Sequence, residues 1–383
     1  MTRIQLSPLP SLDPSPANPP EHWVGNPPTS FQNPWPSFNK HGFLDALHTR
    51  FGPDRNFVPV PETRDELVKV RTPDWGRSQN GWGNGLKATW IGHASFLIET
   101  SCTKESVEKG GRGVRVLFDP VFSERTSPVG WAGPKRYTPT PCTLDDLPEV
   151  DLVVISHNHY DHLDLATIKH VYEKQRQAGK QVHFVAGLGN KAWILSSLPG
   201  ITSAEVTECD WWQSQNVDVE GIGSIQLTCT PTQHFSGRTL WDSGKTLWCS
   251  WVVQDLHPTN PKKLYFSGDT AYKSTTSPSP CPAFAEIGDV FGGFDLALLP
   301  IGLYSPREFM SSVHCCPEDS LEIHKAIRSR KTIGMHYGTV RGGLSAQYED
   351  VREPPRRWQE CCEKEGRWGT ECGLCDIGET VIV

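Results

Sequence analysis

Residues 157–162 carry the sequence HNHYDH, the feature that most limits what this chain can fold into. The metal-ligating side chains within it are His157, His159, Asp161 and His162. They directly follow the apolar run at residues 151–156, which predicts a buried strand. Imidazole nitrogens and carboxylate oxygens are ligands that suit zinc or iron. Although any one of these histidines alone could be an ordinary core residue, the cluster predicts a metal site at the end of a strand.

Three later strand-like runs each end in a further potential ligand. Residues 225–234 end in His234, residues 263–269 in Asp269 and residues 332–336 in His336. In α/β folds, polar groups that act on ligands gather at strand ends, because a rigid sheet aims them into a shared crevice. Taken singly, either histidine is more often a core or surface residue. Their common position after an apolar strand favours one site that contains them all.

The spacing within HNHYDH predicts two groups of ligands. Residues 157 and 159 lie on one face of an extended segment, because side chains alternate along a strand. We expect Asp161 and His162 to open the next helix, which Gly179 can end. The apolar stripe of that helix contains Leu165, Ile168, Val171 and Tyr172. The bend between strand and helix would divide the ligands between two ions.

The motifs around these residues resemble those of the N-acylphosphatidylethanolamine-hydrolysing phospholipase D family, a branch of the metallo-β-lactamase superfamily. HxHxDH followed by a separate His, a Gly-Asp-Thr and a final His is similar to the superfamily pattern, and the flanking motifs point to the branch. They are NPWPS (33–37), TWIGHA (89–94), GPKR (133–136), ISHNHYDHLD (155–164), CPAFAEIG (281–288) and PIG (300–302). The resemblance implies an α/β fold, the αββα sandwich, with a dinuclear metal site at one edge.

The resemblance also implies a role for each side chain of the site. His157, His159 and His234 would bind one ion; Asp161, His162 and His336 would bind the other; Asp269 would bridge the two. The implied cofactor is two zinc ions per chain, with iron or manganese as alternatives. His314 would lie near the substrate phosphate. The predicted catalytic groups are Asp161, Asp269 and His314, and the predicted substrate contacts are Tyr160, Phe235 and His314.

A pair of ions suits the cleavage of a phosphodiester. Two ions roughly 3.5 to 4 Å apart acidify a bridging water and stabilise charge on the attacking and leaving oxygens. We expect a metal-bound hydroxide to be the nucleophile, since metal-bound water can have a pKa near 7. The leading hypothesis is hydrolysis of N-acylphosphatidylethanolamine to N-acylethanolamine and phosphatidic acid. The alternatives are a dinuclear hydrolase of another ester, a lactone or a thioester, and a binding module without activity.

Two further residues near predicted strand ends each keep two interpretations. Asp119 could accept a hydrogen bond from a ligand imidazole, or it could be an ordinary turn former before Pro120. His93 could line the site, or its side chain could be bonded to the backbone. The sequence does not decide between these roles.

The proline content divides the 383 residues into two parts. Ten prolines between residues 8 and 36 forbid a continuous helix, so residues 1–80 are expected to form an extended arm with a mobile start. Residues 81–383 would form one catalytic domain. The apolar side chains of residues 31–43, among which Trp35 and Phe38 are the largest, are candidates for the wall of an apolar substrate groove.

Charge and hydropathy limit the partners and the location. The formal net charge of −7 and the lack of a basic run argue against nucleic acid as a partner. No apolar stretch approaches the roughly 18 to 20 residues of a membrane-spanning helix, and the first residues lack the apolar core of a signal peptide. We expect an intracellular protein, cytoplasmic or peripherally membrane-associated, that acts on a phospholipid. The sequence leaves open whether the chain forms a homodimer.

Two other features invite a functional interpretation. Of the twelve cysteines, Cys361 and Cys362 with the Cys372-Gly-Leu-Cys375 motif could chelate zinc or form a redox pair, although the loose spacing favours buried thiols. Residues 273–280, KSTTSPSP, are an insertion relative to the family pattern. Their composition predicts a surface loop close to the mouth of the site.

Overall fold

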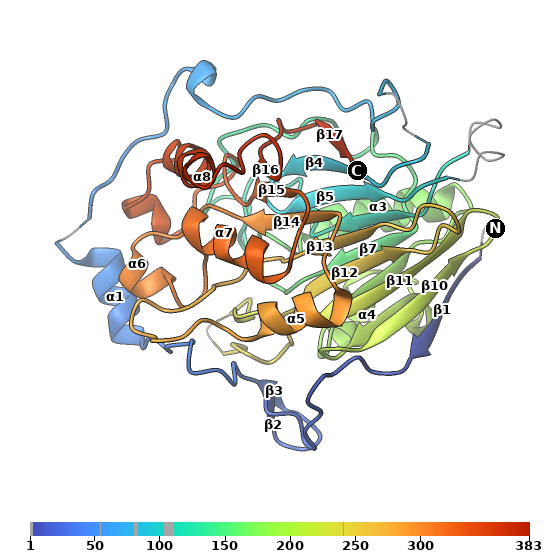
Figure 1. Cartoon of the computed structure of the whole chain (residues 1–383), viewed down its shortest axis with the longest axis horizontal. Helices are drawn as coiled ribbons and strands as arrows, with labels where there is room; N and C mark the ends of the chain where they lie inside the picture. Colours follow the sequence, from blue (N-terminus) through green and yellow to red (C-terminus); the bar gives the residue numbers. More distant parts are fainter. Residues whose placement is uncertain (1–2, 54, 80–82, 103–110, 240) are drawn as a thin grey trace.

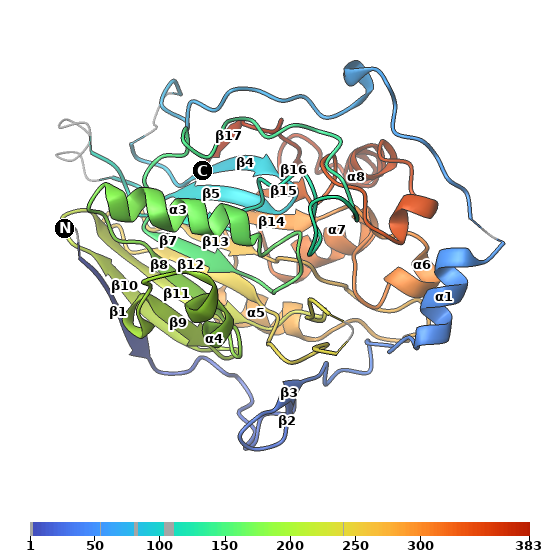
Figure 2. The same ribbon diagram turned by 180° about the vertical axis from the view of Figure 1, so that it is seen from behind.

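The computed structural model describes residues 3–53, 55–79, 83–102, 111–239 and 241–383. Two β-sheets pack face to face, and helices cover both outer faces (Figures 1 and 2). The predicted αββα sandwich is therefore confirmed. The predicted boundary between arm and catalytic domain, after residue 80, falls at residues 80–82. These residues lie outside the described ones, so the boundary stays a prediction.

The larger sheet contains eight strands in the order β1-β10-β11-β12-β13-β14-β15-β16. The strands are β1 (Ile4–Leu9), β10 (Ser214–Val219), β11 (Gly223–Thr230), β12 (Ser250–Asp255), β13 (Lys263–Phe266), β14 (Leu296–Pro300), β15 (Thr332–Met335) and β16 (Cys372–Gly373). Pairing is antiparallel from β1 to β13 and parallel from β13 to β16. The parallel strands therefore end at one edge, where ligands commonly bind.

The smaller sheet contains seven strands in the order β17-β4-β5-β6-β7-β8-β9. The strands are β4 (Lys87–Gly92), β5 (Ser95–Glu99), β6 (Arg115–Phe118), β7 (Leu152–Ile155), β8 (His183–Gly187), β9 (Val206–Cys209) and β17 (Thr380–Ile382). Strands β6 to β9 are parallel, so β7 ends at the same edge as its neighbours. A separate two-stranded hairpin joins β2 (Trp23–Val24) to β3 (Ser30–Phe31).

Helices pack on both outer faces of the sandwich. The helices are α1 (Phe43–Phe51), α3 (Leu165–Gln177), α4 (Lys191–Ser197), α5 (Ala283–Phe291), α6 (Arg307–Met310), α7 (Pro317–Ala326) and α8 (Glu353–Lys364). Short 3₁₀ turns are η1 (Arg64–Glu66), η2 (Ser203–Glu205) and η3 (Ser345–Gln347). α3 and α4 cover the seven-stranded sheet, whereas α5 and α7 cover the eight-stranded one (Figures 1 and 2). Among the described residues, no helix has the length and apolar character needed to cross a bilayer.

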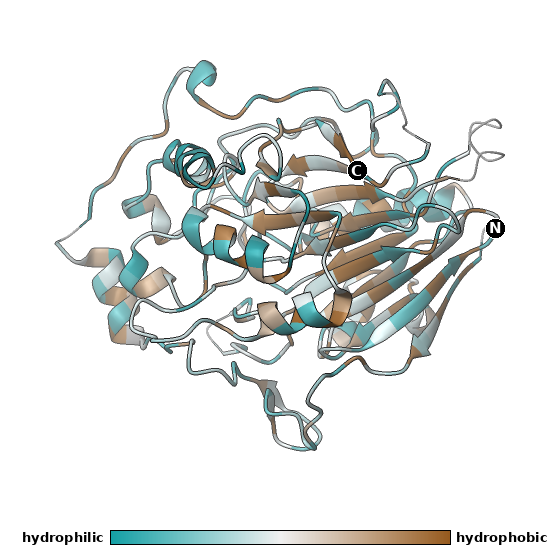
Figure 3. Cartoon of the chain, in the orientation of Figure 1, coloured by the Kyte–Doolittle hydropathy of each residue, from teal (hydrophilic) through white to brown (hydrophobic). Residues whose placement is uncertain are grey.

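Apolar residues fill the space between the sheets. Trp90, Phe118 and Trp251 are fully buried there, and apolar residues are concentrated in the strands while α8 presents mostly polar ones (Figure 3). A second core lies beneath α3, where Ile168 and Val171 pack on the sheet. Burial of such a side chain is worth roughly 1.5 to 3 kcal/mol, so the two cores hold the strand ends in fixed positions.

The helix after HNHYDH begins later than predicted. The Asp164 carboxylate accepts the N–H of Ala166 at 3.2 Å and caps α3 at Leu165. Asp161 and His162 therefore lie in the turn before the helix, where the N–H of His162 donates to the carbonyl of His159. The predicted helix stop is confirmed, because Gly179 has φ +69° just after α3.

The arm is ordered from Ile4 onward, although the sequence predicted a mobile start. Residues Ile4–Leu9 form β1, which pairs antiparallel with β10 at the edge of the larger sheet. The backbone hydrogen bonds of this pair supply an order that the proline content alone does not predict. Further along, the arm runs past the hairpin β2–β3 to α1, which lies with α6 at the end of the molecule opposite the N-terminus (Figure 1).

Candidate metal centre

The structure brings all seven predicted ligands to one edge of the sandwich. His157 and His159 follow β7, and Asp161 and His162 form the turn before α3. His234 comes four residues after β11, Asp269 follows β13, and His336 directly follows β15. The two sheets thus contribute to one cluster, as the positions of these residues after apolar strands predicted.

The first group of ligands contains three histidines. Nε2 of His157 lies 2.9 Å from Nδ1 of His159, and Nε2 of His234 lies 3.3 Å from the same Nδ1. The ring nitrogens of all three lie within 4.8 Å of one another. A cluster of three imidazole nitrogens of this size is a typical divalent-metal site.

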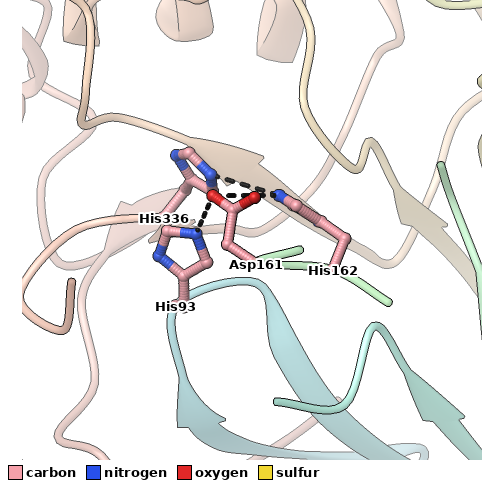
Figure 4. A group of neighbouring side chains, drawn as sticks. All are labelled: His93, Asp161, His162 and His336. Atoms are coloured by element: carbon pink, nitrogen blue, oxygen red, sulfur yellow. Dashed lines mark hydrogen bonds and ion pairs between the residues drawn. The ribbon is translucent and has the colours of Figure 1, made fainter. Parts of the chain in front are cut away.

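The second group contains Asp161, His162 and His336, together with His93 (Figure 4). Nε2 of His162 lies 3.3 Å from Nε2 of His336, and Nε2 of His93 lies 3.0 Å from Oδ2 of Asp161. Of the two interpretations of His93, the structure therefore favours the one in which its side chain lines the site. His93 was not predicted as a ligand, although its position directly after a strand is the same feature that marks the predicted ligands.

Asp269 lies between the two groups. Its Oδ2 is 3.2 Å from Nε2 of His162 and 3.7 Å from Nε2 of His234, and its Oδ1 is 2.8 Å from Nε2 of His336. The side chain is only 2% exposed. This position suits the predicted bridging role. The assignment of individual ligands to individual ions stays a prediction.

Buried acceptors fix the orientation of the histidine rings. Nδ1 of His162 lies 2.7 Å from Oδ2 of Asp119, and Nδ1 of His234 lies 2.7 Å from the carbonyl of Val313. Nδ1 of His157 lies 2.9 Å from Oγ of Ser156. When Nδ1–H donates to such a partner, the lone pair of Nε2 faces the site. Of the two interpretations of Asp119, the hydrogen bond to a candidate ligand is the one the structure supports.

Unusual backbone conformations occur at the same edge. His93, Asp119 and His336 have φ of +54°, +39° and +63°, in the left-handed region that non-glycine residues rarely adopt. Each such residue costs of order 1–3 kcal/mol, which the surrounding sheets must hold. The positive φ turns these side chains toward the cluster, which a regular extended backbone would not do.

A glycine lets two of the strand ends meet. Gly268, directly before Asp269, has φ +57°, and a Cβ there would lie 2.5 Å from Cβ of Ser156. Only a residue without a side chain fits between them. The close approach brings β13 of one sheet next to the end of β7 of the other, so Asp269 reaches the HNHYDH histidines.

The electrostatics of the cluster suit a cation. Burial lowers the pKa of His234 to about 3 and of His159 to about 4, so both imidazoles are neutral at pH 7 and keep a lone pair. Against burial, Asp269 and Asp161 hold the pKa of His162 well above its usual value. In the described part of the chain, the ion-pair partners of Asp269 are all histidines. A buried carboxylate that no lysine or arginine neutralises, among nitrogen donors, fits a divalent metal ion.

The N-terminal arm supports the segment that carries His234. Nδ2 of Asn33 donates to the carbonyl of His234 at 2.7 Å, and Oγ of Ser37 donates to Oε1 of Gln233 at 2.5 Å. Both arm residues belong to the NPWPS motif. The motif is visible in the sequence, but this contact could not be predicted, because the local pattern does not show which distant segment the arm contacts.

A cavity of about 330 Å³ opens onto the cluster. The polar side chains that line it include His159, Tyr160, Asp161, Asp269 and His314, and the apolar ones include Leu303, Met310, Val340 and Leu344. His314 has its Nδ1 3.9 Å from Oδ2 of Asp269 and without a hydrogen-bond partner. The cavity is therefore polar where it meets the cluster and apolar along one wall.

The remaining predicted contacts lie outside this lining. The ring of Phe235 packs on His159 with ring centroids 4.5 Å apart, but Phe235 is not among the described residues that line the cavity. Trp35 stacks on Trp211 at 5.2 Å instead of lining the cavity, and Phe38 is also absent from the described lining. The apolar wall comes from residues after β14 and β15 rather than from the arm.

The cysteine motif and the insertion have no part in the cluster. Among the described residues, the groups that could hold a metal contain only histidine and aspartate, so Cys372 and Cys375 take no part in one. Both thiols are buried. Residues 273–280 form a largely exposed loop, as predicted, and the described cavity lining does not include them.

Comparison with known proteins agrees with the fold and the site. Residues 114–337 match the model of the β-lactamase superfamily domain. A possible metal-dependent hydrolase from Veillonella parvula has a similar fold, with a TM-score of 0.55, 15% identity, and coverage of 78% of this chain and 100% of that one. An isothiocyanate hydrolase from Delia radicum gut bacteria has a TM-score of 0.54, 18% identity, and coverage of 77% and 98%. The chain is a metal-dependent hydrolase with a metallo-β-lactamase fold.

Closer relatives define the branch. An N-acyl-phosphatidylethanolamine-hydrolyzing phospholipase D 1 from Caenorhabditis elegans is 35% identical over 297 residues, which cover 77% of this chain and 75% of the relative. A mitochondrial enzyme of the same name from Saccharomyces cerevisiae is 32% identical over 70% of this chain and 52% of its own length. This chain belongs to the N-acyl-phosphatidylethanolamine-hydrolysing phospholipase D family.

Proposed function

We propose that this chain hydrolyses the phosphodiester of N-acylphosphatidylethanolamine and releases N-acylethanolamine and phosphatidic acid. The observation that carries the proposal is the cavity at the cluster, polar at one end and apolar along one wall. A phospholipid has the same polarity, with a charged phosphate next to acyl chains. The names of the relatives from worm and yeast support the same substrate class.

We propose two zinc ions as the cofactor, with iron or manganese as alternatives. His157, His159 and His234 would hold one ion; Asp161, His162 and His336 would hold the other; Asp269 would lie between them. Seven candidate ligands exceed what one tetrahedral site uses. When bound, such a pair supplies a hydroxide at neutral pH and polarises the phosphoryl oxygens.

The chain's own residues would orient the substrate and handle its protons. Burial lowers the pKa of His314 to about 3, so its imidazole is neutral at pH 7 and can donate one hydrogen bond to a phosphate oxygen. His314 lines the cavity, and its unpartnered Nδ1 lies 3.9 Å from Oδ2 of Asp269. The Tyr160 ring lines the same cavity and is held by Arg238, whose guanidinium lies 3.9 Å from the ring centroid. Tyr160 and His314 would flank the phosphate, whereas Asp269 would keep the opposite side negative.

The surface beside the cavity suits peripheral contact with a membrane. Leu44, Leu47 and Phe51 are exposed on one face of α1, with Leu44 78% and Phe51 64% exposed. The ring of His41 packs on Phe309 of α6 at 4.8 Å, next to the cavity residue Met310. Exposed apolar helix faces of this kind bind bilayer interfaces. An intracellular protein with this surface could take its lipid from a membrane.

The test identifies both products and the bond that breaks. Purified metal-loaded protein is incubated with N-acylphosphatidylethanolamine in ¹⁸O-labelled water. Attack at phosphorus with loss of the ethanolamine oxygen predicts phosphatidic acid that carries the label and an unlabelled N-acylethanolamine. Diacylglycerol together with a phosphorylated N-acylethanolamine would mean cleavage on the other side of phosphorus, and no reaction would contradict the proposed substrate.

A further inference from the structure

Glu349 is a buried carboxylate that the metal centre does not use. It is 5% exposed. Its Oε1 accepts the N–H of Leu303 at 2.8 Å, and its Oε2 accepts the N–H groups of Tyr304 at 2.8 Å and Ser305 at 3.3 Å. In the described part of the chain no lysine or arginine forms an ion pair with it. Three successive backbone N–H groups are therefore its main stabilisation.

The turn that Glu349 holds is strained and faces the cavity. Leu303 has φ +65°, which costs a residue with a Cβ of order 1–3 kcal/mol. Its side chain is 8% exposed and belongs to the apolar wall of the cavity. Hydrogen bonds to a charged acceptor are the strong kind, so the carboxylate can keep Leu303 in a conformation that it would otherwise leave.

The backbone of Glu349 also closes the loop that forms the second half of the same wall. Residues 340–345, which follow β15, supply Val340, Leu344 and Ser345 to the cavity. Nη2 of Arg341 donates to the backbone carbonyl of Glu349 at 2.9 Å, and the N–H of Glu349 donates to the carbonyl of Ser345 at 2.8 Å. The Glu349 backbone thus closes one loop, while its side chain fixes the turn after β14.

We propose that Glu349 is a positioning residue that joins the two halves of the apolar wall and thereby selects substrates with a long acyl chain. The inference rests on the proposed function only for the identity of the lipid. Glu349 comes thirteen residues after His336, and its side chain contacts none of the candidate metal ligands through the hydrogen bonds above. Its loss should therefore alter chain selection and leave the metal centre intact.

Glu349→Gln is the decisive variant, because it keeps size and shape. A glutamine side chain has one oxygen, so its NH₂ group would face an N–H of the turn, and at least one hydrogen bond is lost. Glu353→Gln is the matched control. Oε1 of Glu353 accepts the hydroxyl of Tyr304 at 2.7 Å, so it contacts the same turn without lining the cavity or holding the backbone N–H groups.

The measurement compares two probes by titration calorimetry on the zinc-loaded proteins at pH 8, at which the Glu349 carboxylate is charged. Dodecyl phosphate and methyl phosphate share a headgroup and differ only in the chain. We expect Glu349→Gln to weaken binding of dodecyl phosphate about tenfold and of methyl phosphate less than twofold, the loss of about one charged hydrogen bond. Glu353→Gln should bind both probes as the wild type does. An equal change for both probes, or no change, overturns the proposal, as does a wild type that prefers neither probe.

These results separate the two proposals. If probe binding depends on the chain and on Glu349, but the wild type does not cleave N-acylphosphatidylethanolamine, the positioning role is supported and the proposed reaction is refuted. Cleavage with unchanged probe selectivity in Glu349→Gln would do the reverse. Should Glu349→Gln fail to fold by circular dichroism, Glu349→Asp replaces it, because the side chain that is one methylene shorter keeps the charge but holds the N–H groups of Leu303 and Tyr304 less closely. The same selective loss is expected, and unchanged selectivity overturns the proposal.

Discussion

Residues with positive φ occur both at the metal centre and in the apolar wall of the cavity, but different contacts stabilise them in the two regions. His93 and His336 at the centre and Leu303 in the wall all have positive φ. At the centre, strands of two sheets hold the strained residues, and buried acceptors such as Asp119 fix the rings. In the wall, one carboxylate, that of Glu349, holds the strained turn.

The difference assigns chemistry and selectivity to different parts of the molecule. Groups at strand ends are positioned by the whole core, so they tolerate little change and can serve one type of reaction. Groups on loops depend on a few hydrogen bonds, so their arrangement can vary between relatives that share the metal site. Substitutions at the centre should therefore reduce turnover of every substrate, and those in the wall only of some.

The largest effect is expected for Asp269→Asn. The change removes the carboxylate that lies between the two ligand groups, so it should lower activity about a thousandfold, or about 4 kcal/mol of transition-state stabilisation. The metal-free variant should also be less stable than the wild type, because the buried His162 imidazole, whose pKa Asp269 helps to raise, loses its charged partner. Thermal unfolding with and without zinc would show that the metal-induced rise in Tm has largely gone.

Asp289→Asn is the matched control for this variant. Asp289 is 67% exposed and forms a surface ion pair with Arg328. Its substitution should leave both activity and the effect of zinc unchanged. Full activity in Asp269→Asn would contradict a centre that needs this carboxylate.

Removal of one ligand from either group should release the ion that this group is proposed to hold. We expect His157→Ala and His336→Asn each to lower the metal content from about two ions per chain to about one and activity about a hundredfold. Asparagine is chosen at position 336 because it tolerates the positive φ of His336. Elemental analysis measures the ions, and circular dichroism checks the sheets. A wild type that holds a single ion after purification with excess zinc would refute the two-ion site.

A smaller effect is expected at the contact between the arm and the centre. Asn33→Ala removes the 2.7 Å hydrogen bond to the carbonyl of His234 and should lower zinc affinity or kcat/KM about tenfold, as the loss of other residues that orient ligands does. Gln32→Ala is the control, because the Gln32 side chain donates to the exposed carbonyl of Glu21 and not to the segment that carries His234. If the two variants behave alike, the arm has no specific role at the metal centre.

The centre was largely predictable from the sequence because its signals are local. HNHYDH after an apolar run marks a ligand-bearing strand end without any knowledge of distant contacts. The same holds for His234, Asp269 and His336, each of which follows an apolar run. Only the exact start of α3 was wrong, since the cap formed by Asp164 is a local competition that periodicity does not resolve.

The cavity wall was not predictable, because it depends on contacts between distant segments. Glu349 meets Leu303 across 46 residues of sequence, and no periodicity or motif connects them. Trp35 was a plausible wall residue from its size alone, but it stacks on Trp211. Apolar character predicts burial and not the partner, so loops that are joined by single hydrogen bonds need a structure.

The last expected effect concerns stability rather than turnover, and it tests whether the Glu349 carboxylate holds the wall. Burial raises the pKa of Glu349 from its ordinary value near 4.5 to about 7. Between these pH values the folded protein binds a proton that the unfolded chain has released, so this residue's contribution to stability is full below pH 4.5 and is lost as the pH rises through 7. The free energy of unfolding of the metal-free wild type should therefore fall by roughly 3 kcal/mol more between pH 5 and pH 8 than that of Glu349→Gln, as urea unfolding would measure. The wild type would then lose stability over the pH range in which the carboxylate becomes charged, which is the expected cost of a buried charge kept for the shape of a cavity. Equal slopes with pH for the two proteins would mean that the Glu349 carboxylate is not desolvated as the structure has it.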